Sequence, residues 1–318
     1  MRFDFIAKED GILLKTLLKQ QGISKKLLAK IKFDGGDLRV NGVQATAVFR
    51  LAKQDQVTVV IPREAATPTL TPQDYPLKIV YEDAHFLVLD KPAGIASVTG
   101  QNYPDQTMSN FVAGYLKAQE YENQKVHVVT RLDKDTSGLM LFAKHGYAHS
   151  RMDQLLQKKA LTKKYYAVVH RSDQLLAQAE IRLPIGRKDG SIIERAVVAA
   201  DHPTAKSAHT SYEVIQSNDQ LALVDIQLHT GRTHQIRVHF AHLGASLLGD
   251  DLYGGRRDTI KRQALHCHFL SFVHPFSNQK LVLTSALPED MQRILDLGAN
   301  QKSEQAALEK DRATQIVV

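Results

Sequence analysis

The chain has 318 residues, of which 43% are hydrophobic and 24% charged, a globular composition long enough for one large domain or two ordinary ones. Its formal net charge of +7 is too small for a histone-like polycation but favours a polyanionic partner. No apolar run approaches the roughly 20 residues of a membrane span, and acidic residues stand where a signal peptide would be apolar. The single cysteine, Cys267, excludes an intramolecular disulfide framework. We therefore expect a cytoplasmic protein that does not enter a membrane.

Residues 1–62 are predicted to form a small α+β unit. Leucine spacing and β-branched runs bounded by glycine indicate two helices and two strands, over residues 12–22, 24–33, 35–42 and 56–62. Ser24 stands where the second helix needs an N-cap. Five of the seven surplus positive charges lie in this unit. Residues 63–75 are rich in proline, threonine and alanine, which predicts a semi-extended linker and places the domain boundary there.

Residues 76–297 are predicted to form one large β-rich domain. The expected strands are residues 77–83, 85–92, 139–145, 163–170, 179–185, 195–200, 207–216 and 221–228, and the expected helices are 148–159 and 284–298. These strands arrive as hairpins without regular βαβ alternation, so we expect an α+β fold with a mixed, mostly antiparallel sheet. The polar residues 298–318 are predicted to be a flexible tail.

Two segments of the large domain carry the residues best suited to chemistry. In residues 127–144, Asp133 lies in a polar turn between two apolar strands, where a carboxylate is rigidly mounted yet reachable. The turn alone is equally consistent with two solvated aspartates, since aspartate and glycine are common turn residues. In residues 229–242, a helix is expected to start at Gly231–Thr233, which brings Arg232 and Arg237 into its first turns. Arginines at that end of a helix favour a bound anion, because the helix dipole is positive there.

The motifs of this domain resemble those of a known enzyme family. RLDKDTSG (residues 131–138) is similar to the catalytic signature of the RNA pseudouridine synthases of the ribosomal large-subunit (RluA/RluD) family. Four other motifs of that family occur in its order, and they are LDKPAGI (89–95), TGRTHQIRVH (230–239), GDDLYGG (249–255) and RQALHCHFLSFVHP (262–275). Five motifs in order form a specific pattern, which covers residues 76–297. The resemblance implies the pseudouridine synthase fold and the isomerisation of uridine in structured RNA, with large-subunit ribosomal RNA as the expected partner.

The resemblance also implies roles for individual residues. Asp133 matches the aspartate that attacks the target uridine, and Arg237 the arginine that pairs with the catalytic carboxylate. Tyr165 matches the tyrosine that stacks on the base and is also a candidate for moving a proton. Tyr166 is the neighbour most easily mistaken for Tyr165, but it should point to the other face of the strand. The expected substrate contacts are Arg131, Ile236 and Lys91, and Arg232 is expected to bind RNA. The family commonly has histidine where this chain has Thr130, which affects target choice rather than activity.

Residues 1–62 resemble a degenerate alpha-L RNA-binding motif. Its expected RNA-binding residues are Lys25, Lys26, Lys30 and Lys32. The glycine–aspartate pair that usually precedes the last strand of this motif is absent. Alternatively, the four lysines only form a solvated face of the helix and bind no RNA.

Other functions remain open from the sequence. Asp133–Thr136, with the sequence DKDT, also resembles the DxDxT motif of magnesium-dependent aspartyl phosphatases, with Asp250 and Asp251 as the acidic metal motif. Arg131 within the preceding strand argues against this interpretation. A non-catalytic RNA-binding assembly factor is a second alternative. No metal site is expected, because His234, His239 and His242 lack the i, i+4 spacing of a zinc helix. We expect no cofactor, a monomeric protein and a packed Cys267.

Overall fold

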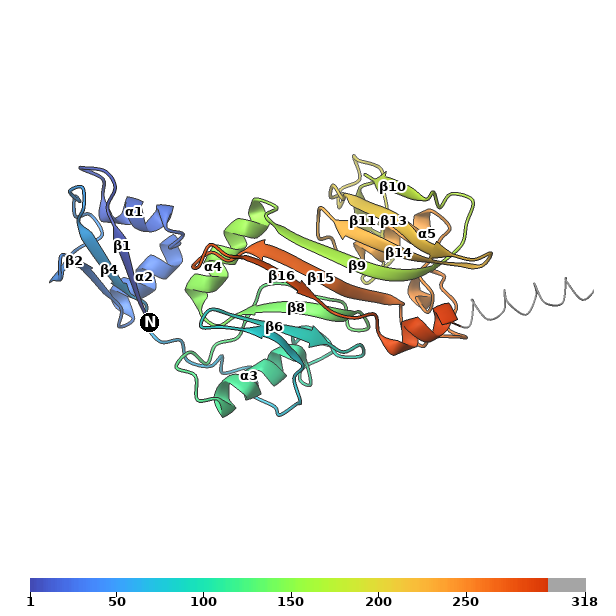
Figure 1. Ribbon diagram of the computed structural model, residues 1–318, viewed down its shortest axis with the longest axis horizontal. Helices are drawn as coiled ribbons and strands as arrows, with labels where there is room; N and C mark the ends of the chain where they lie inside the picture. Colours follow the sequence, from blue (N-terminus) through green and yellow to red (C-terminus); the bar gives the residue numbers. More distant parts are fainter. Residues whose placement is uncertain (297–318) are drawn as a thin grey trace, which may run out of the picture.

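The computed structural model describes residues 1–296, so the predicted tail over residues 298–318 lies outside the described residues. Figure 1 shows a small N-terminal body beside a larger one built on a long sheet. None of the helices in the described part is long and apolar enough to span a bilayer.

The small body, here the N-terminal module, consists of a four-stranded sheet and two helices. The sheet order is β1 (Arg2–Ile6), β4 (Gln56–Val60), β2 (Asp37–Val40) and β3 (Val43–Gln44), and the helices are α1 (Leu14–Gln20) and α2 (Lys25–Phe33). The Ser24 hydroxyl accepts a hydrogen bond from the Leu27 amide at 3.2 Å, which confirms the predicted N-cap. The sequence prediction missed β1, which pairs with β4 and completes the core of the module.

The large body is organised around a ten-stranded mixed sheet. Eight strands follow in the order β10 (Gln178–Ile181), β13 (Thr210–Ser217), β14 (Leu221–Leu228), β9 (Leu161–His170), β15 (Leu265–Val273), β8 (Ser137–Ala143), β6 (Phe86–Lys91) and β5 (Ile79–Glu82), while β16 (Lys280–Thr284) pairs with β15 and β7 (His127–Val128) with β8. A separate hairpin joins β11 (Ile185–Arg187) and β12 (Arg195–Val197). Among these pairs only β8 and β15 run parallel, which confirms the mixed, mostly antiparallel α+β fold.

The parallel pair brings two distant segments together. Ser137 and Gly138 at the start of β8 lie opposite His266 and Cys267 of β15, and the Ser137 hydroxyl lies 2.9 Å from Nδ1 of His266. Gly138 has a φ of +110°, and a Cβ on it would lie 2.3 Å from the Cys267 carbonyl oxygen. Only glycine allows this approach. Cys267 is fully buried in the core, as predicted.

The helices of the large body are α3 (Met108–Ala118), α4 (Gly146–Gln157), α5 (Gln235–His242) and the short η1 (Asp251–Tyr253). Helix α3 was not predicted, although the Thr107 side chain caps it. The helix predicted over residues 284–298 was wrong at its start, because Thr284 belongs to β16 and helical structure begins at Glu289. Pro288 fits this boundary, since proline favours the first turn of a helix.

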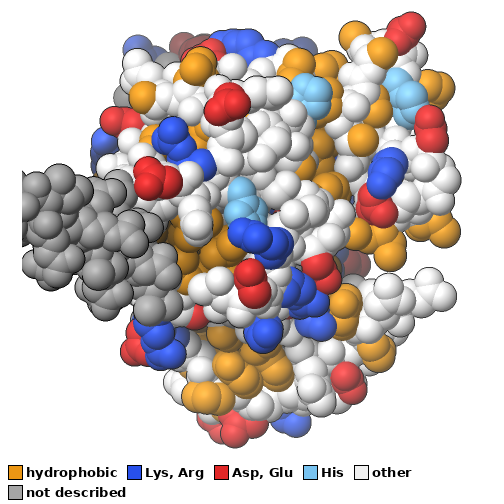
Figure 2. Space-filling view, turned by 90° about the vertical axis from the view of Figure 1, so that its right-hand side faces the viewer, with side chains coloured by type: hydrophobic (Ala, Val, Ile, Leu, Met, Phe, Trp, Pro, Cys, Tyr) orange, Lys and Arg blue, Asp and Glu red, His pale blue; other side chains and the backbone are white. Residues whose placement is uncertain are grey.

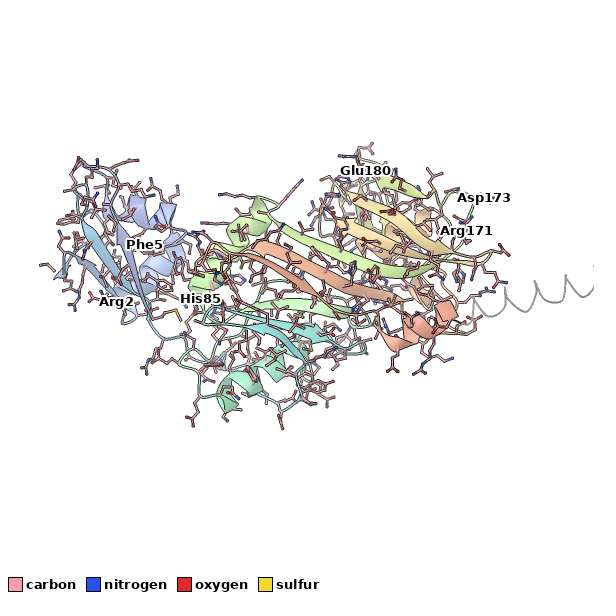
Figure 3. All side chains as sticks on the ribbon, in the orientation of Figure 1. Arg2, Phe5, His85, Arg171, Asp173 and Glu180 are labelled. Carbon is pink, nitrogen blue, oxygen red and sulfur yellow. The ribbon has the colours of Figure 1, made fainter. Side chains whose placement is uncertain are left out.

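The N-terminal module contacts the large body through aromatic side chains. The ring of Phe3 lies 4.8 Å from that of Tyr147 and 5.7 Å from that of Phe276, and the Tyr147 hydroxyl donates to the Gln21 carbonyl at 2.7 Å. His85 lies at the end of the large sheet that faces the module (Figure 3). These contacts give the module a defined place on α4.

The linker expected over residues 63–75 has no regular secondary structure, but its residue Glu64 is buried. The Glu64 side chain is 7% exposed. It accepts hydrogen bonds from the Gly146 amide at 2.6 Å and Lys30 at 3.3 Å, and lies 2.9 Å from Nε2 of His127. Burial opposes its ionisation, but these partners outweigh burial and lower the pKa of Glu64 to about 2.

We expect Glu64→Gln to destabilise the protein in a pH-dependent way. A folded-state pKa below the unfolded value adds stability that is fully present above about pH 4.5 and is lost as the pH falls toward 2. The difference in free energy of unfolding at pH 7 should reach at most about 3 kcal/mol. Urea unfolding of both proteins at pH 7 and pH 3 measures this difference. A gap that does not narrow at pH 3 would contradict the assignment.

Candidate active site

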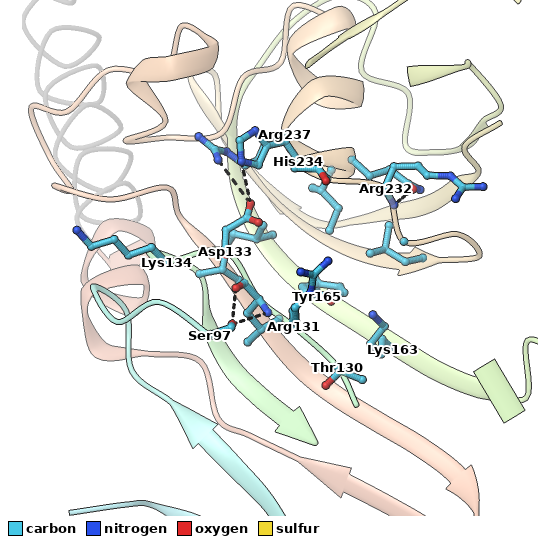
Figure 4. Close-up of a pocket in the computed structure, with 18 of the residues that line it drawn as sticks. Ser97, Thr130, Arg131, Asp133, Lys134, Lys163, Tyr165, Arg232, His234 and Arg237 are labelled. Carbon is cyan, nitrogen blue, oxygen red and sulfur yellow. Dashed lines mark hydrogen bonds and ion pairs between the residues drawn. The ribbon is translucent and has the colours of Figure 1, made fainter. Parts of the chain in front are cut away.

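A cavity of about 510 Å³ opens where three segments converge, a size typical of ligand pockets. Its walls come from the turn around Ser97, the segment leading into β8 that carries Asp133, and the segment from Gly231 to Arg237 that leads into α5. Side chains of β9 form its floor. Figure 4 shows Asp133 facing Arg237 and His234 across this cavity.

The backbone around Asp133 is fixed by side chains from elsewhere in the chain. Ser97 exchanges two hydrogen bonds with Leu132, donating to its carbonyl at 2.5 Å and accepting from its amide at 3.0 Å. Gln263 donates to the Thr136 hydroxyl at 3.1 Å, and Arg262 to the Asp135 carbonyl at 3.4 Å. The carboxylate of Asp133 is thus rigidly mounted, while 31% of its side-chain surface stays exposed.

Lys91, which the sequence analysis placed in contact with the substrate, lies behind the site instead. Its side chain is fully buried and is not among the residues that line the cavity. Its Nζ donates to the carbonyls of Pro92, Ile95 and Lys134 at 2.7–2.8 Å, which uses the three N–H groups of an ammonium. Burial lowers the pKa of Lys91 to about 7, although the charges of Asp135 and Asp133 oppose the shift. Lys91 therefore supports the turn that carries Asp133.

Arg237 contacts two carboxylates rather than one. Its guanidinium forms a bidentate ion pair with Asp250, with both N–O distances 2.7 Å, and its Nη1 lies 3.5 Å from Oδ2 of Asp133. Arg237 and Asp250 are almost fully buried, and the guanidinium lies 4.9 Å from the ring centre of Tyr253. The expected contact between Arg237 and Asp133 is present, but Asp250 holds the guanidinium in place.

The helix after this segment starts later than predicted. Helix α5 begins at Gln235, and the N-cap position is His234, whose φ of 58° is left-handed. The Gln235 side chain accepts hydrogen bonds from the Arg232 amide and the Thr230 hydroxyl, which shapes the turn before the helix. Arg232 therefore lies before the helix and donates to the Ser207 carbonyl at 2.9 Å. Ile236, in the first turn, lines the cavity as expected.

Strand β9 separates the two neighbouring tyrosines, as predicted. Tyr165 lines the cavity, whereas Tyr166 stacks on His268 on the other face, with ring centres 3.6 Å apart. Burial raises the pKa of Tyr165 well above its usual range, and the nearby Cys267 and Asp133 add to the effect. Lys163, two residues before Tyr165 in the chain, also lines the cavity, and burial lowers the pKa of Lys163.

The other predicted residues lie at the rim of the cavity or on the N-terminal module. Arg131 lines the cavity and is exposed, while the Thr130 hydroxyl accepts a hydrogen bond from the Leu141 amide. Lys25, Lys26 and Lys32 are exposed on α2, but Lys30 pairs with Glu64. On the face of the molecule opposite the N-terminal module, basic and acidic side chains alternate (Figure 2).

The side chains that the phosphatase interpretation would assign to a metal are engaged in ion pairs. Asp250 pairs with Arg237, and Asp251 with Arg257 at 2.9 Å. Within residues 1–296 no group of three or more histidine, cysteine or acidic side chains is arranged to hold a metal ion. The sheet, moreover, is not the alternating βαβ structure that the phosphatase fold requires.

Comparison with known proteins identifies the family. Residues 85–242 match the family model described as RNA pseudouridylate synthase. The chain is 42% identical to the uncharacterized RNA pseudouridine synthase YjbO of Bacillus subtilis, over 89% of this chain and 98% of that protein. The chain belongs to the RluA/RluD family of RNA pseudouridine synthases. It is also 35% identical to ribosomal large subunit pseudouridine synthase D of Xanthomonas campestris, over 82% of this chain and 80% of that protein.

Solved structures share the fold of this pseudouridine synthase. Human RNA pseudouridylate synthase domain containing 1 aligns with a TM-score of 0.55 at 24% identity, covering 66% of this chain and 83% of that one. Human RNA pseudouridylate synthase domain containing 4 aligns with the same score and identity, over 67% and 90%. The comparisons support neither the phosphatase nor the non-catalytic alternative.

The sequence analysis of this pseudouridine synthase missed several residues around Asp133. They include Ser97, His234, Asp250 and Tyr253. The motif GDDLYGG contains Asp250 and Tyr253, and TGRTHQIRVH contains His234, so a signal was present. The order of motifs alone did not show that all three surround Asp133 and Arg237. Ser97 lies outside the quoted motifs and carries no comparable signal.

Proposed function

We propose that this synthase isomerises a uridine of large-subunit ribosomal RNA, with Asp133 as its nucleophile. The observation that carries the proposal is the rigidly mounted, partly exposed Asp133 carboxylate in a cavity with Arg237 beside it. An aspartate is ionised at neutral pH without a separate base, so it can attack directly. The names of relatives such as the synthase D of Xanthomonas campestris support ribosomal RNA as the substrate.

The reaction balances without an oxidant or a reductant. The bond between N1 of uracil and C1′ of ribose breaks, and a bond between C5 and C1′ forms. The hydrogen on C5 leaves as a proton, and N1 gains a proton. The target uridine has to leave the base stack first, because its glycosidic bond is not accessible within a helix. The exposed Arg131 at the cavity rim is suited to hold the RNA open.

Tyr165 is assigned a contact with the extruded base. Its ring lies in the cavity wall, and its raised pKa keeps the phenol protonated at neutral pH. A protonated phenol can stack on the base and donate a hydrogen bond to it. Ile236 adds apolar surface to the same cavity, and Arg232 carries positive charge near its mouth for a phosphate.

Modification mapping tests the proposed function. Pseudouridine is mapped in ribosomal and transfer RNA from cells with and without this protein, and purified protein is incubated with RNA from the deletion strain. We expect one or a few large-subunit sites to disappear in the deletion strain and to return in vitro. If no site disappears and the purified protein converts no uridine, the proposal fails. Sites in transfer RNA alone would reject only the ribosomal substrate.

We also propose that the N-terminal module binds RNA through the exposed lysines of α2. Replacing Lys25, Lys26 and Lys32 together with alanine should weaken RNA binding. The logarithm of the affinity should also fall less steeply with the logarithm of the salt concentration, by about 0.9 in slope for each phosphate contact that is lost. Filter binding at several salt concentrations measures both. An unchanged slope would favour a solvated lysine face.

We further propose that the enzyme is a monomer in the cytoplasm. Size-exclusion chromatography with light scattering tests the monomeric state.

A further inference from the structure

His234 lies close to the carboxylate of Asp133, and the proposed function does not yet include it. Its Nε2 lies 3.8 Å from Oδ2 of Asp133, and only 14% of its side chain is exposed. It has a left-handed φ of 58°, a conformation that costs a residue other than glycine about 1 kcal/mol or more. Strain of this kind is typical of residues whose side chain has to occupy one particular place.

The hydrogen bonds around Tyr253 fix which nitrogen of His234 carries the proton. The Arg195 amide of β12 donates to the Tyr253 hydroxyl oxygen at 3.0 Å, and that oxygen lies 2.8 Å from Nδ1 of His234. Among the described residues, Nδ1 is the acceptor available to the hydroxyl hydrogen of Tyr253. The hydroxyl therefore donates to Nδ1, and the ring proton of His234 is on Nε2, pointing toward Asp133.

Burial, more than the charges around it, keeps the ring of His234 neutral. Burial lowers the pKa of His234 and the positive charges of Arg237 and Arg195 act in the same direction, while Asp133 and Asp250 oppose them. A neutral ring has one N–H, so the hydrogen bond from Tyr253 decides where it points. The phenol ring of Tyr253 also lies against the guanidinium of Arg237, so the three side chains support one another.

Both donors near Asp133 point to the same oxygen of its carboxylate. Nη1 of Arg237 and Nε2 of His234 approach Oδ2, whereas Oδ1 makes no hydrogen bond with residues 1–296. Two donors on one oxygen fix the plane of the carboxylate and leave the other oxygen free to attack. The 3.8 Å distance shortens to a hydrogen bond with a shift of about 1 Å, and such contacts in unliganded sites commonly tighten when substrate binds.

We propose that His234 is a positioning residue, which orients the Asp133 carboxylate through Nε2–H, and that the hydroxyl of Tyr253 sets this tautomer. The inference deepens the proposed function and rests on it, because it assumes that Asp133 attacks the uridine. It also connects the catalytic carboxylate to the β11–β12 hairpin, since Arg195 belongs to β12.

Two substitutions of His234 separate this function from a purely structural one. In H234Q the side-chain amide nitrogen can reach the place of Nε2, whereas in H234N it reaches only the place of Nδ1. A left-handed backbone, however, favours asparagine over glutamine. Positioning through Nε2 predicts a higher kcat for H234Q, while a backbone function predicts higher kcat and Tm for H234N. We expect kcat of H234N to fall about 10²-fold and that of H234Q to fall much less, with KM nearly unchanged in both.

The assay measures tritium released from C5 of uridine in large-subunit ribosomal RNA transcribed with [5-³H]uridine. Y253F keeps the ring and should lower kcat several-fold without changing KM. H242Q, at the exposed end of the same helix, is the matched control and should keep wild-type kcat and Tm. Equal kcat for H234N and H234Q, a higher value for H234N, or wild-type kcat for Y253F would overturn the inference. Wild-type protein that releases no tritium would instead count against the proposed function.

Discussion

Replacing Asp133 with asparagine is expected to abolish pseudouridine formation, with a loss of at least about 10⁴-fold in kcat. The amide keeps the volume of the carboxylate but cannot attack as an anion. Because Asp133 is partly exposed and its turn is held by other side chains, such as Ser97 and Lys91, that bind the backbone of its neighbours, the variant should fold. Tritium release under single-turnover conditions measures the loss, and a thermal melt checks the fold.

Asp135→Asn is the matched control for this prediction. Asp135 lies in the same turn, and its carboxylate forms no hydrogen bond or ion pair with the described residues. We expect most of the activity to remain. A phosphatase of the DxDxT type would instead require both aspartates. Appreciable pseudouridine formation by the Asp133→Asn variant would show that the nucleophile has been assigned wrongly.

Replacing Asp250 with alanine is expected to reduce both stability and activity. Asp250 is almost fully buried and forms two hydrogen bonds with the guanidinium of Arg237. Removing one partner of a buried ion pair leaves an uncompensated charge and costs about 3–5 kcal/mol. The guanidinium would then be free to turn fully onto Asp133, and a displacement of about 1 Å at a reacting group can cost about 10²-fold in rate.

Two further variants separate the stability effect from the activity effect. Asp251→Asn removes a carboxylate that is 62% exposed and pairs with Arg257, so we expect a change of less than about 1 kcal/mol. The double substitution Arg237→Met and Asp250→Leu replaces the buried pair with apolar groups and should recover stability but not activity. Urea unfolding and tritium release measure the two effects. A stable, fully active Asp250→Ala protein would refute the assigned function of this pair.

Elements with a strong local pattern could be predicted from the sequence. Helix α2 was predicted with its N-cap, and the strands around Tyr165 and Asp133 were placed correctly because their apolar runs are bounded by turn residues. The mixed sheet also followed from the succession of hairpins. Strand β1 and helix α3 were overlooked although each carries a local signal, the first the alternation of charged and apolar residues and the second an amphipathic pattern that follows the capping residue Thr107.

The sequence brought together residues that share one cavity in the structure, but not the side chains that support them. Motifs identified Asp133, Tyr165 and Arg237, and the structure places all three at one cavity. The functions of Lys91 and Asp250 depend on contacts with residues far away in the chain: Lys91 reaches the Lys134 carbonyl, and Arg237 links Asp250 to Asp133. No local pattern encodes such contacts. Lys91 was therefore assigned to the substrate, although it supports the turn.

The parallel pairing of β8 with β15 has a consequence for the synthesis of the enzyme. The contact between Ser137 and His266 spans 129 residues, and Arg262 and Gln263, which hold the turn of Asp133, come just before β15. Contacts of such long range form late, because chain entropy opposes them until both partners exist. A nascent chain that has not yet released β15 from the ribosome thus lacks the support that Arg262 and Gln263 give to the turn of its proposed nucleophile. We expect the enzyme to become fully active only when nearly all of its large body has been translated.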